Sequence, residues 1–133
     1  MFQKLEIFQV AHAMASHAGR LQSVAAQNMA NADTPGFKAK RLTPFKDTLA
    51  NARLGVAQRS TRSGHLNGST QDGPPSAQAQ VQIDERAKSD PNGNSVAIED
   101  QILLSVDAKR QHDRALAIYR SSLNILRTSI GRS

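Results

Sequence analysis

The sequence predicts a mainly α-helical fold, in which long N- and C-terminal helices form a coiled-coil hairpin joined by an irregular, partly disordered middle with little β structure. All five prolines and six of the eight glycines lie between residues 33 and 95, and a continuous helix excludes both residue types. Each flank carries apolar side chains at helical spacing. We therefore divide the chain into an N-terminal core helix (1–32), an irregular basic middle (33–95) and a C-terminal core helix (96–133).

The N-terminal flank is predicted to be one helix from about residue 3 to about residue 31. Alanine is abundant here, so intrinsic helix propensity agrees with the pattern. The side chains at 4-3-4-3 spacing form one narrow stripe, made of Ile7, Ala11, Met14, Ala18, Leu21, Ala25, Asn28 and Ala32.

The C-terminal flank has signals for both ends of a helix. Asn94 and Ser95 are good N-cap residues, Glu99 and Asp100 fall in the first turn, and Gly131 can stop the helix in a left-handed conformation. The predicted stripe is Ile98, Ile102, Ser105, Lys109, His112, Leu116, Tyr119, Leu123, Leu126 and Ile130. Lys109 and His112 are unusual in an apolar stripe, so the face of this helix that packs against the first helix stays open.

The middle holds only nine large apolar residues in 63. Thr43 as N-cap and Pro44 at the first helical position predict a short helix near 44–53. Alternation of apolar and polar residues predicts a short strand near 79–83.

Neither stripe makes a strong core alone, since one is mostly alanine and small side chains bury little area. Closing the 63-residue middle also costs roughly 3.7 kcal/mol of loop entropy. A self-sufficient hairpin and a hairpin completed by neighbouring subunits both fit, and the weak stripes favour the second. The assembly interface that we predict consists of Leu21, Ala25, Asn28, Asn31, Leu116, Tyr119, Leu123, Leu126 and Ile130.

Composition argues against an enzyme. Leu, Ile, Val and Phe make up 28 of the 133 residues, and the chain has no Cys and no Trp. His12 and His17 are five apart and lie on different sides of a helix, which does not suit a metal pair. We expect no catalytic residue, no cofactor, no metal and no small-molecule substrate. No cleavable signal peptide and no membrane span are expected either.

The net charge of +6 comes entirely from one irregular segment. Between residues 35 and 62 the only acidic residue is Asp47, and the basic residues are Lys38, Lys40, Arg41, Lys46, Arg53, Arg59 and Arg62. Such a segment could dock onto an acidic protein face, phosphates or anionic lipids, or be a solvated loop with no specific partner. A small basic nucleic-acid or anionic-surface binding module is therefore the alternative function, although no helix-turn-helix or RNA-recognition motif accompanies the charge.

The end of the first helix carries the most specific pattern. Asn28 places an amide on an apolar seam, which can fix register at a cost in stability. Asn31 and Asp33 can bond local backbone as the helix ends. Thr34-Pro35-Gly36 then suits a type II turn, with Phe37 as an apolar anchor and Lys38 after it.

This stretch resembles the N-terminal signature of bacterial flagellar axial proteins, the rod, hook and related subunits: Asn28, Asn31, then Thr34, Pro35, Gly36, Phe37 and Lys38. The short chain and the segment 90–96 (DPNGNSV) before the C-terminal helix are similar to proximal-rod members of that family. The resemblance implies a structural rod subunit, exported by the flagellar type III apparatus without a cleaved signal and assembled in the periplasm. The implied partners are other rod subunits and the proteins of the membrane ring and rod junction.

Overall fold

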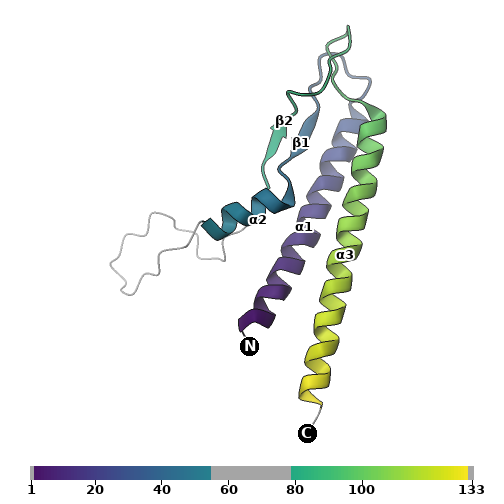
Figure 1. Cartoon of the computed structure of the whole chain (residues 1–133). Coiled ribbons are helices and arrows are strands. Elements are labelled where there is room, and N and C mark those ends of the chain that lie inside the picture. The colour runs from purple at the N-terminus through teal and green to yellow at the C-terminus, as the bar shows by residue number, and fades with distance from the viewer. Residues whose placement is uncertain (1, 55–78, 132–133) are drawn as a thin grey trace, which may run out of the picture.

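The structure is a computed structural model that describes the backbone of residues 2–54 and 79–131 and the side chains of residues 6–50 and 79–131. Its elements are α1 (Phe2–Ala30), β1 (Lys40–Leu42), α2 (Phe45–Leu54), β2 (Val81–Ile83) and α3 (Ile98–Ile130). The two long helices lie side by side and antiparallel, with both chain ends at one end of the pair (Figure 1). The fold is mainly helical with little strand, as the sequence predicts.

The face of α1 that packs against α3 is the central part of the predicted stripe, whereas Ile7 is 45% exposed and Met14 and Ala32 are half-buried. Ala11, Ala18, Leu21, Ala25 and Asn28 are all buried, and Ala25 is 0% exposed. Small side chains let two helix backbones approach closely, which is why an alanine stripe can form the centre of this interface. This part of the sequence prediction is confirmed.

The face of α3 that packs against α1 differs from the predicted stripe. The buried residues of α3 are Gln101, Ala108 and Ala115, and Leu104 packs partly buried against the core. The predicted Ile98, Ile102, Lys109 and His112 are exposed, so the real seam is turned by about one residue position around the helix. Large apolar residues occupy most of the predicted positions, whereas the positions that face α1 hold Gln101, Leu104, Ala108 and Ala115.

A short antiparallel sheet packs beside the upper half of α1 (Figure 1). Arg41 of β1 lies opposite Gln82 of β2, and the sheet contributes Leu42 to a core that also holds Leu21, Val24, Ala79 and Ala108. The strand β1 was not predicted from the sequence, since Lys40-Arg41-Leu42 has no alternating pattern. The helix α2 begins at Phe45, where Asp47 and Thr48 donate backbone N–H groups to the Pro44 carbonyl.

The predicted capping residues have other partners. The N-cap of α3 is Ala97, without a side-chain cap bond, because Ser95 Oγ accepts the Ala39 N–H instead and Asn94 is used in the loops. Gly131 ends α3 with φ −80°, and its N–H donates to the Arg127 carbonyl. The prediction of a left-handed Gly131 was therefore wrong.

Candidate assembly site

The two loops at the closed end of the hairpin, residues 31–39 and 89–96, bond directly to each other, and we call this region the loop junction. Asn94 is its centre: the side chain is 1% exposed and its Nδ2 donates to the carbonyls of Asn31, Ala32 and Thr34 at 2.7–2.9 Å. Its Oδ1 accepts the Val96 N–H at 2.7 Å. Asn94 therefore ties the loop that follows α1 to the loop that precedes α3.

Two glycines allow the loops of the junction to meet. Gly36 (φ +74°) and Gly93 (φ +82°) both adopt the left-handed conformation that favours glycine. A Cβ built on Gly93 would lie 3.3 Å from Gly36 Cα. The Phe37 N–H donates to the Thr34 carbonyl across Pro35-Gly36, which fits the predicted type II turn. The sequence indicated each turn but not that the two turns touch.

Asn28 joins three elements from inside the helix pair. Its Nδ2 donates to the Lys40 carbonyl at 2.7 Å and to Gln101 Oε1 at 2.9 Å, and its Oδ1 accepts the Lys40 N–H at 2.9 Å. The side chain thus takes the place of a neighbouring strand on the free edge of β1 while also bonding α3. The sequence suggested that this amide fixes helix register. In the structure it also attaches the sheet to both helices.

Asn31, three residues later, has a local role. Its Nδ2 donates to the Gln27 carbonyl at 2.8 Å, and its Oδ1 accepts from Thr34 Oγ at 3.3 Å. Both bonds are exposed to solvent. The two motif asparagines therefore differ: one is a buried link between elements and the other a helix-end residue.

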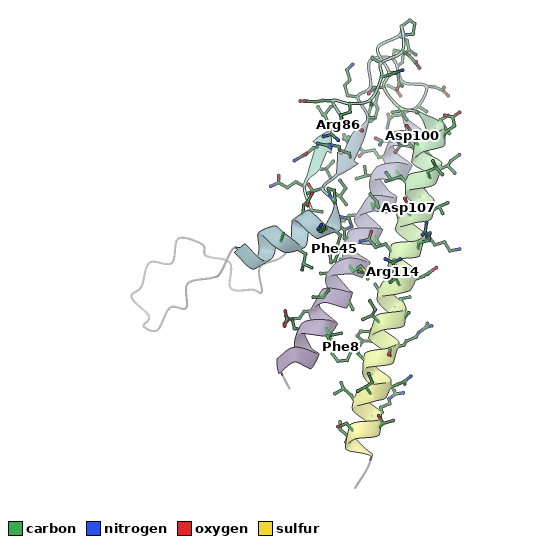
Figure 2. The ribbon with its side chains drawn as sticks, viewed as in Figure 1. Phe8, Phe45, Arg86, Asp100, Asp107 and Arg114 are labelled. Carbon is green, nitrogen blue, oxygen red and sulfur yellow. The ribbon has the colours of Figure 1, made fainter. Side chains whose placement is uncertain are left out.

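His17 is a buried link that sequence reasoning missed. Its Nε2 lies 2.8 Å from the Thr43 carbonyl and its Nδ1 lies 3.0 Å from Gln111 Nε2 of α3. A proton on Nε2 would let the ring donate to the Thr43 carbonyl and accept from the Gln111 amide. The ring also packs edge-on against Phe45, labelled at the start of α2 in Figure 2, with centroids 5.5 Å apart. The partners of His17 lie 26 and 94 positions away in the sequence, so no local pattern indicates this contact.

The described basic residues of the middle are partly engaged within the chain. Lys38 Nζ lies 3.4 Å from Ser89 Oγ and 3.3 Å from the Gly93 carbonyl, and Lys40 Nζ lies 6.0 Å from the centre of the Phe37 ring. Arg41 donates to Gln82 Oε1 at 3.5 Å. Lys46 is exposed on α2. The side chain of Arg53 and the residues Arg59 and Arg62 lie outside the described part of the chain.

The structure divides the predicted assembly residues into two groups. Leu21, Ala25 and Asn28 are buried against α3 and the sheet, so they cannot touch a neighbouring chain unless the hairpin opens. The C-terminal group is more accessible: Leu116, Tyr119 and Ile130 are exposed, and Leu123 and Leu126 are half-buried. Tyr119 also packs edge-on against Phe8 of α1, with ring centroids 5.2 Å apart.

The outward side of α3 carries large apolar side chains near its N-terminal end and again at Leu116 and Ile130, with the exposed charged residues Lys109, Arg110 and Asp113 between Val106 and Leu116. We define the outer stripe as Ile98, Ile102, Val106, Leu116 and Ile130, whose spacings of 4, 4, 10 and 14 residues keep them on one side of the helix. All five are exposed, Ile130 to 75%. Leu103, Ile118 and Ile125 are exposed too. Exposed large apolar side chains gathered on one side of a helix are typical of a protein interaction site.

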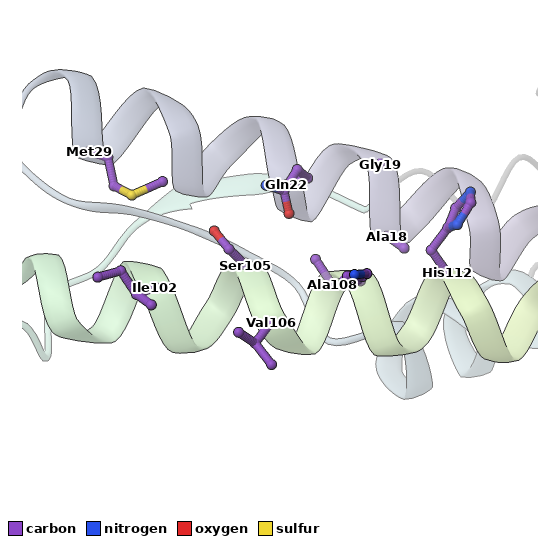
Figure 3. Close-up of a pocket in the computed structure, with 10 residues that line it drawn as sticks. Ala18, Gly19, Gln22, Met29, Ile102, Ser105, Val106, Ala108 and His112 are labelled. Carbon is purple, nitrogen blue, oxygen red and sulfur yellow. The ribbon is translucent and has the colours of Figure 1, made fainter.

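A groove runs beside the outer stripe between the two long helices (Figure 3). Its volume is about 620 Å³. The α1 wall includes Ala18, Gly19 and Met29, and the α3 wall includes Ile102 and Val106. The groove is open because small residues face each other across it, and nothing lies within 4 Å of a Cβ built on Gly19.

Charge is unevenly distributed along α3. From Ile98 to Asp107 the helix has three acidic residues and no basic residue, whereas from Ala108 to Ile130 it has five basic residues and one acidic residue. Figure 2 labels Asp100 and Asp107 in the first part and Arg114 in the second. The outer stripe therefore runs from an acidic end near the loop junction to a basic end near the chain termini.

Within residues 2–54 and 79–131, no group of three His, Cys, Asp or Glu side chains is placed to hold a metal ion. No helix in that part of the chain is long and apolar enough to cross a membrane.

Among known proteins, the chain is similar to the flagellar basal body rod protein FlgB of Agrobacterium fabrum. The two are 27% identical over 137 residues, an alignment that covers 98% of this chain and 96% of the relative. No protein-family model matches the chain. The alignment includes both long helices, the loop junction and the middle, and it supports a relationship to the flagellar rod proteins.

Proposed function

We propose that this protein is a structural subunit of the bacterial flagellar basal-body rod, of the proximal-rod FlgB type, that assembles into the drive-shaft tube through its terminal helices. The observation that carries the proposal is the outer stripe of α3, which the described residues 2–54 and 79–131 leave exposed. The near full-length similarity to a FlgB protein agrees with it.

The parts of the chain have separate tasks in this proposal. The loop junction and Asn28 hold α1, α3 and the sheet in one arrangement. The outer stripe and the groove then receive helices of neighbouring subunits, and the half-buried Leu123 and Leu126 extend that contact toward the chain ends. If the outer stripe meets a different surface of the neighbouring subunit, the contact is between unlike patches, and such contacts that do not close build an open helical array.

The proposed partners are other rod subunits, the proteins of the membrane ring and rod junction, and the flagellar type III export apparatus. The protein would reach the periplasm through that apparatus. The function is structural and non-enzymatic, with no cofactor and no small-molecule substrate. The basic segment that begins at Lys38 would dock onto neighbouring subunits.

The alternative of a nucleic-acid or anionic-surface binding module has no specific support among the described residues. Lys38, Lys40 and Arg41 each have a partner within the chain. Retention on duplex DNA at low salt, lost steeply as salt rises, would revive that reading.

The proposal is tested in the source bacterium by deleting the gene and restoring it on a plasmid. We expect the deletion to remove flagella and leave growth normal. The wild-type chain should restore flagella and be found in isolated basal bodies by quantitative mass spectrometry. The chain with Ile102→Asp and Val106→Asp should do neither.

The matched control is Glu99→Gln with Asp107→Asn, which changes exposed residues of the same helix without placing a charge on the outer stripe. We expect this control to restore flagella. Basal bodies without the wild-type chain, or full incorporation of the Ile102→Asp and Val106→Asp chain, would contradict the proposal.

A further inference from the structure

Asn92 and Gly93 form the one Asn-Gly sequence in the described residues, and they sit in the middle of the loop junction. In an Asn-Gly sequence the glycine nitrogen can attack the asparagine side chain, because glycine has no side chain to crowd the attack and few restrictions on its backbone. We infer that Asn92 is a site of spontaneous deamidation in the unfolded chain, and that the folded loop junction keeps it unreactive.

The reaction needs no other reactant than water. The Gly93 nitrogen forms a bond to Asn92 Cγ, the bond between Cγ and Nδ2 breaks, and the proton from the Gly93 N–H leaves with Nδ2 as ammonia. The product is a five-membered cyclic imide. Water then opens the ring at either carbonyl, which gives aspartate or isoaspartate at position 92.

The folded loop junction engages the atoms that have to react. The Gly93 N–H, which must be lost, donates to the Asp90 carbonyl at 2.8 Å. Asn92 Oδ1 accepts the Asn94 N–H at 2.9 Å, which fixes the side chain that must be attacked. The Asn92 carbonyl accepts the Gly36 N–H at 3.0 Å. Attack therefore requires the junction to open, although Asn92 itself is exposed to solvent.

One contact acts in the opposite direction. The N–H of Asn94 polarises the Asn92 side-chain carbonyl and so makes Cγ more electrophilic. We expect this effect to be smaller. A more electrophilic Cγ does not speed the reaction while the N–H of the attacking Gly93 nitrogen stays hydrogen-bonded to the Asp90 carbonyl. Comparing the folded and unfolded rates decides between the two effects.

Deamidation before folding has a structural consequence. Isoaspartate adds one carbon atom to the main chain between positions 92 and 93, where the Cβ position of Gly93 is already 3.3 Å from Gly36 Cα. It also moves Asn94 relative to the three carbonyls that its Nδ2 bonds. Aspartate at position 92 keeps the chain length and an oxygen for the Asn94 N–H. The isoaspartate form should therefore fail to rebuild the junction.

The test incubates the full-length protein at mildly alkaline pH in native buffer and in strong urea. Peptide mass spectrometry and isoaspartate methyltransferase labelling follow position 92 over time. Asn67-Gly68, the other Asn-Gly sequence of the chain, is an internal reference for the urea sample. We expect both positions to react at comparable rates in urea, and Asn92 to react at least about tenfold more slowly in native buffer.

Asn94→Ala should raise the native rate at Asn92 toward the urea rate, while Asn124→Ala, a change on the exposed surface of α3, should leave it unchanged. If the Asn94→Ala protein does not fold, wild-type protein in graded urea gives the same information, because the rate should follow the fraction of opened chain. Refolding of urea-aged protein should leave the isoaspartate form in the unfolded fraction. An Asn92 rate in native buffer equal to or above the urea rate would overturn the inference.

Discussion

Replacing Asn28 tests how much the buried amide contributes to the fold. In Asn28→Ala the N–H and carbonyl of Lys40 and the Oε1 of Gln101 lose their partner. A buried polar group without a hydrogen bond costs about 1–3 kcal/mol. Lys40 is half-buried, so water can reach its backbone in part. We expect the free energy of unfolding to fall by about 3–5 kcal/mol, near the upper limit for single substitutions.

The matched control is Asn31→Ala, which removes the other asparagine of the motif. Its hydrogen bonds are exposed, so its loss should cost less than about 1 kcal/mol. Urea unfolding followed by circular dichroism measures both variants, provided that the m-values agree. Hydrogen exchange should also show faster exchange of the Lys40 amide in Asn28→Ala alone. Equal losses for the two variants, or an unchanged Lys40 amide, would refute the reasoning.

Asn28→Asp adds a dependence on pH. The introduced carboxylate would face the Lys40 carbonyl, with which it can bond only when protonated. Burial and this acceptor both raise the pKa of the introduced carboxyl in the folded state. The folded state then binds more protons than the unfolded state, so the variant should be most stable below the ordinary carboxyl pKa and should lose stability as pH rises. Unfolding that does not depend on pH, relative to wild type, would contradict the assigned geometry.

Two further pairs of substitutions test the packing of the junction and of the helix pair. Gly93→Ala should cost about 1–3 kcal/mol because of the positive φ and the 3.3 Å contact with Gly36, whereas Gly19→Ala, in an open helical position, should stabilise by about 0.5–1 kcal/mol. Ala25→Leu should destabilise by about 1–3 kcal/mol or more because the site is fully buried, whereas Ala26→Leu on the exposed side should change stability by less than about 0.5 kcal/mol. Thermal unfolding measures all four, and a reversed order within either pair would contradict the packing described.

Helical periodicity predicted α1 well because half of the residues of its stripe are alanine. Alanine at Ala11, Ala18 and Ala25 marks a face that can only pack closely, and Asn28 stood out as the polar member. The short helix α2 (Phe45–Leu54) and the strand β2 (Val81–Ile83) lie close to the ranges 44–53 and 79–83 that turn residues and alternation predicted.

The register of α3 could not be predicted from its own residues. Its large apolar side chains are spread around the helix, and periodicity favours the side with the most of them. The inner face is instead decided by α1, which accepts Gln101, Ala108 and Ala115. The buried residues of α3 and its exposed large apolar residues form two sets that overlap in the sequence, and periodicity alone does not tell one set from the other.

The candidate site also depended on contacts between distant segments. The two turns at Gly36 and Gly93 were each recognisable from local residue preferences, but the hydrogen bonds of Asn94 to residues some 60 positions away follow from the closure of the hairpin. The same holds for His17, whose partners lie on the β1–α2 connection and on α3. Local preferences therefore identified the parts of the loop junction, and the helix pair brought them together.

The central claim is that the outer stripe of α3 is covered by neighbouring subunits in the assembled rod. The chain has no Cys, so Ile102→Cys introduces a single thiol on that stripe. The rate of thiol alkylation is then compared between the free protein and isolated basal bodies that contain it. We predict fast alkylation in the free protein and strong protection in basal bodies. Equally fast alkylation in both would contradict the claim.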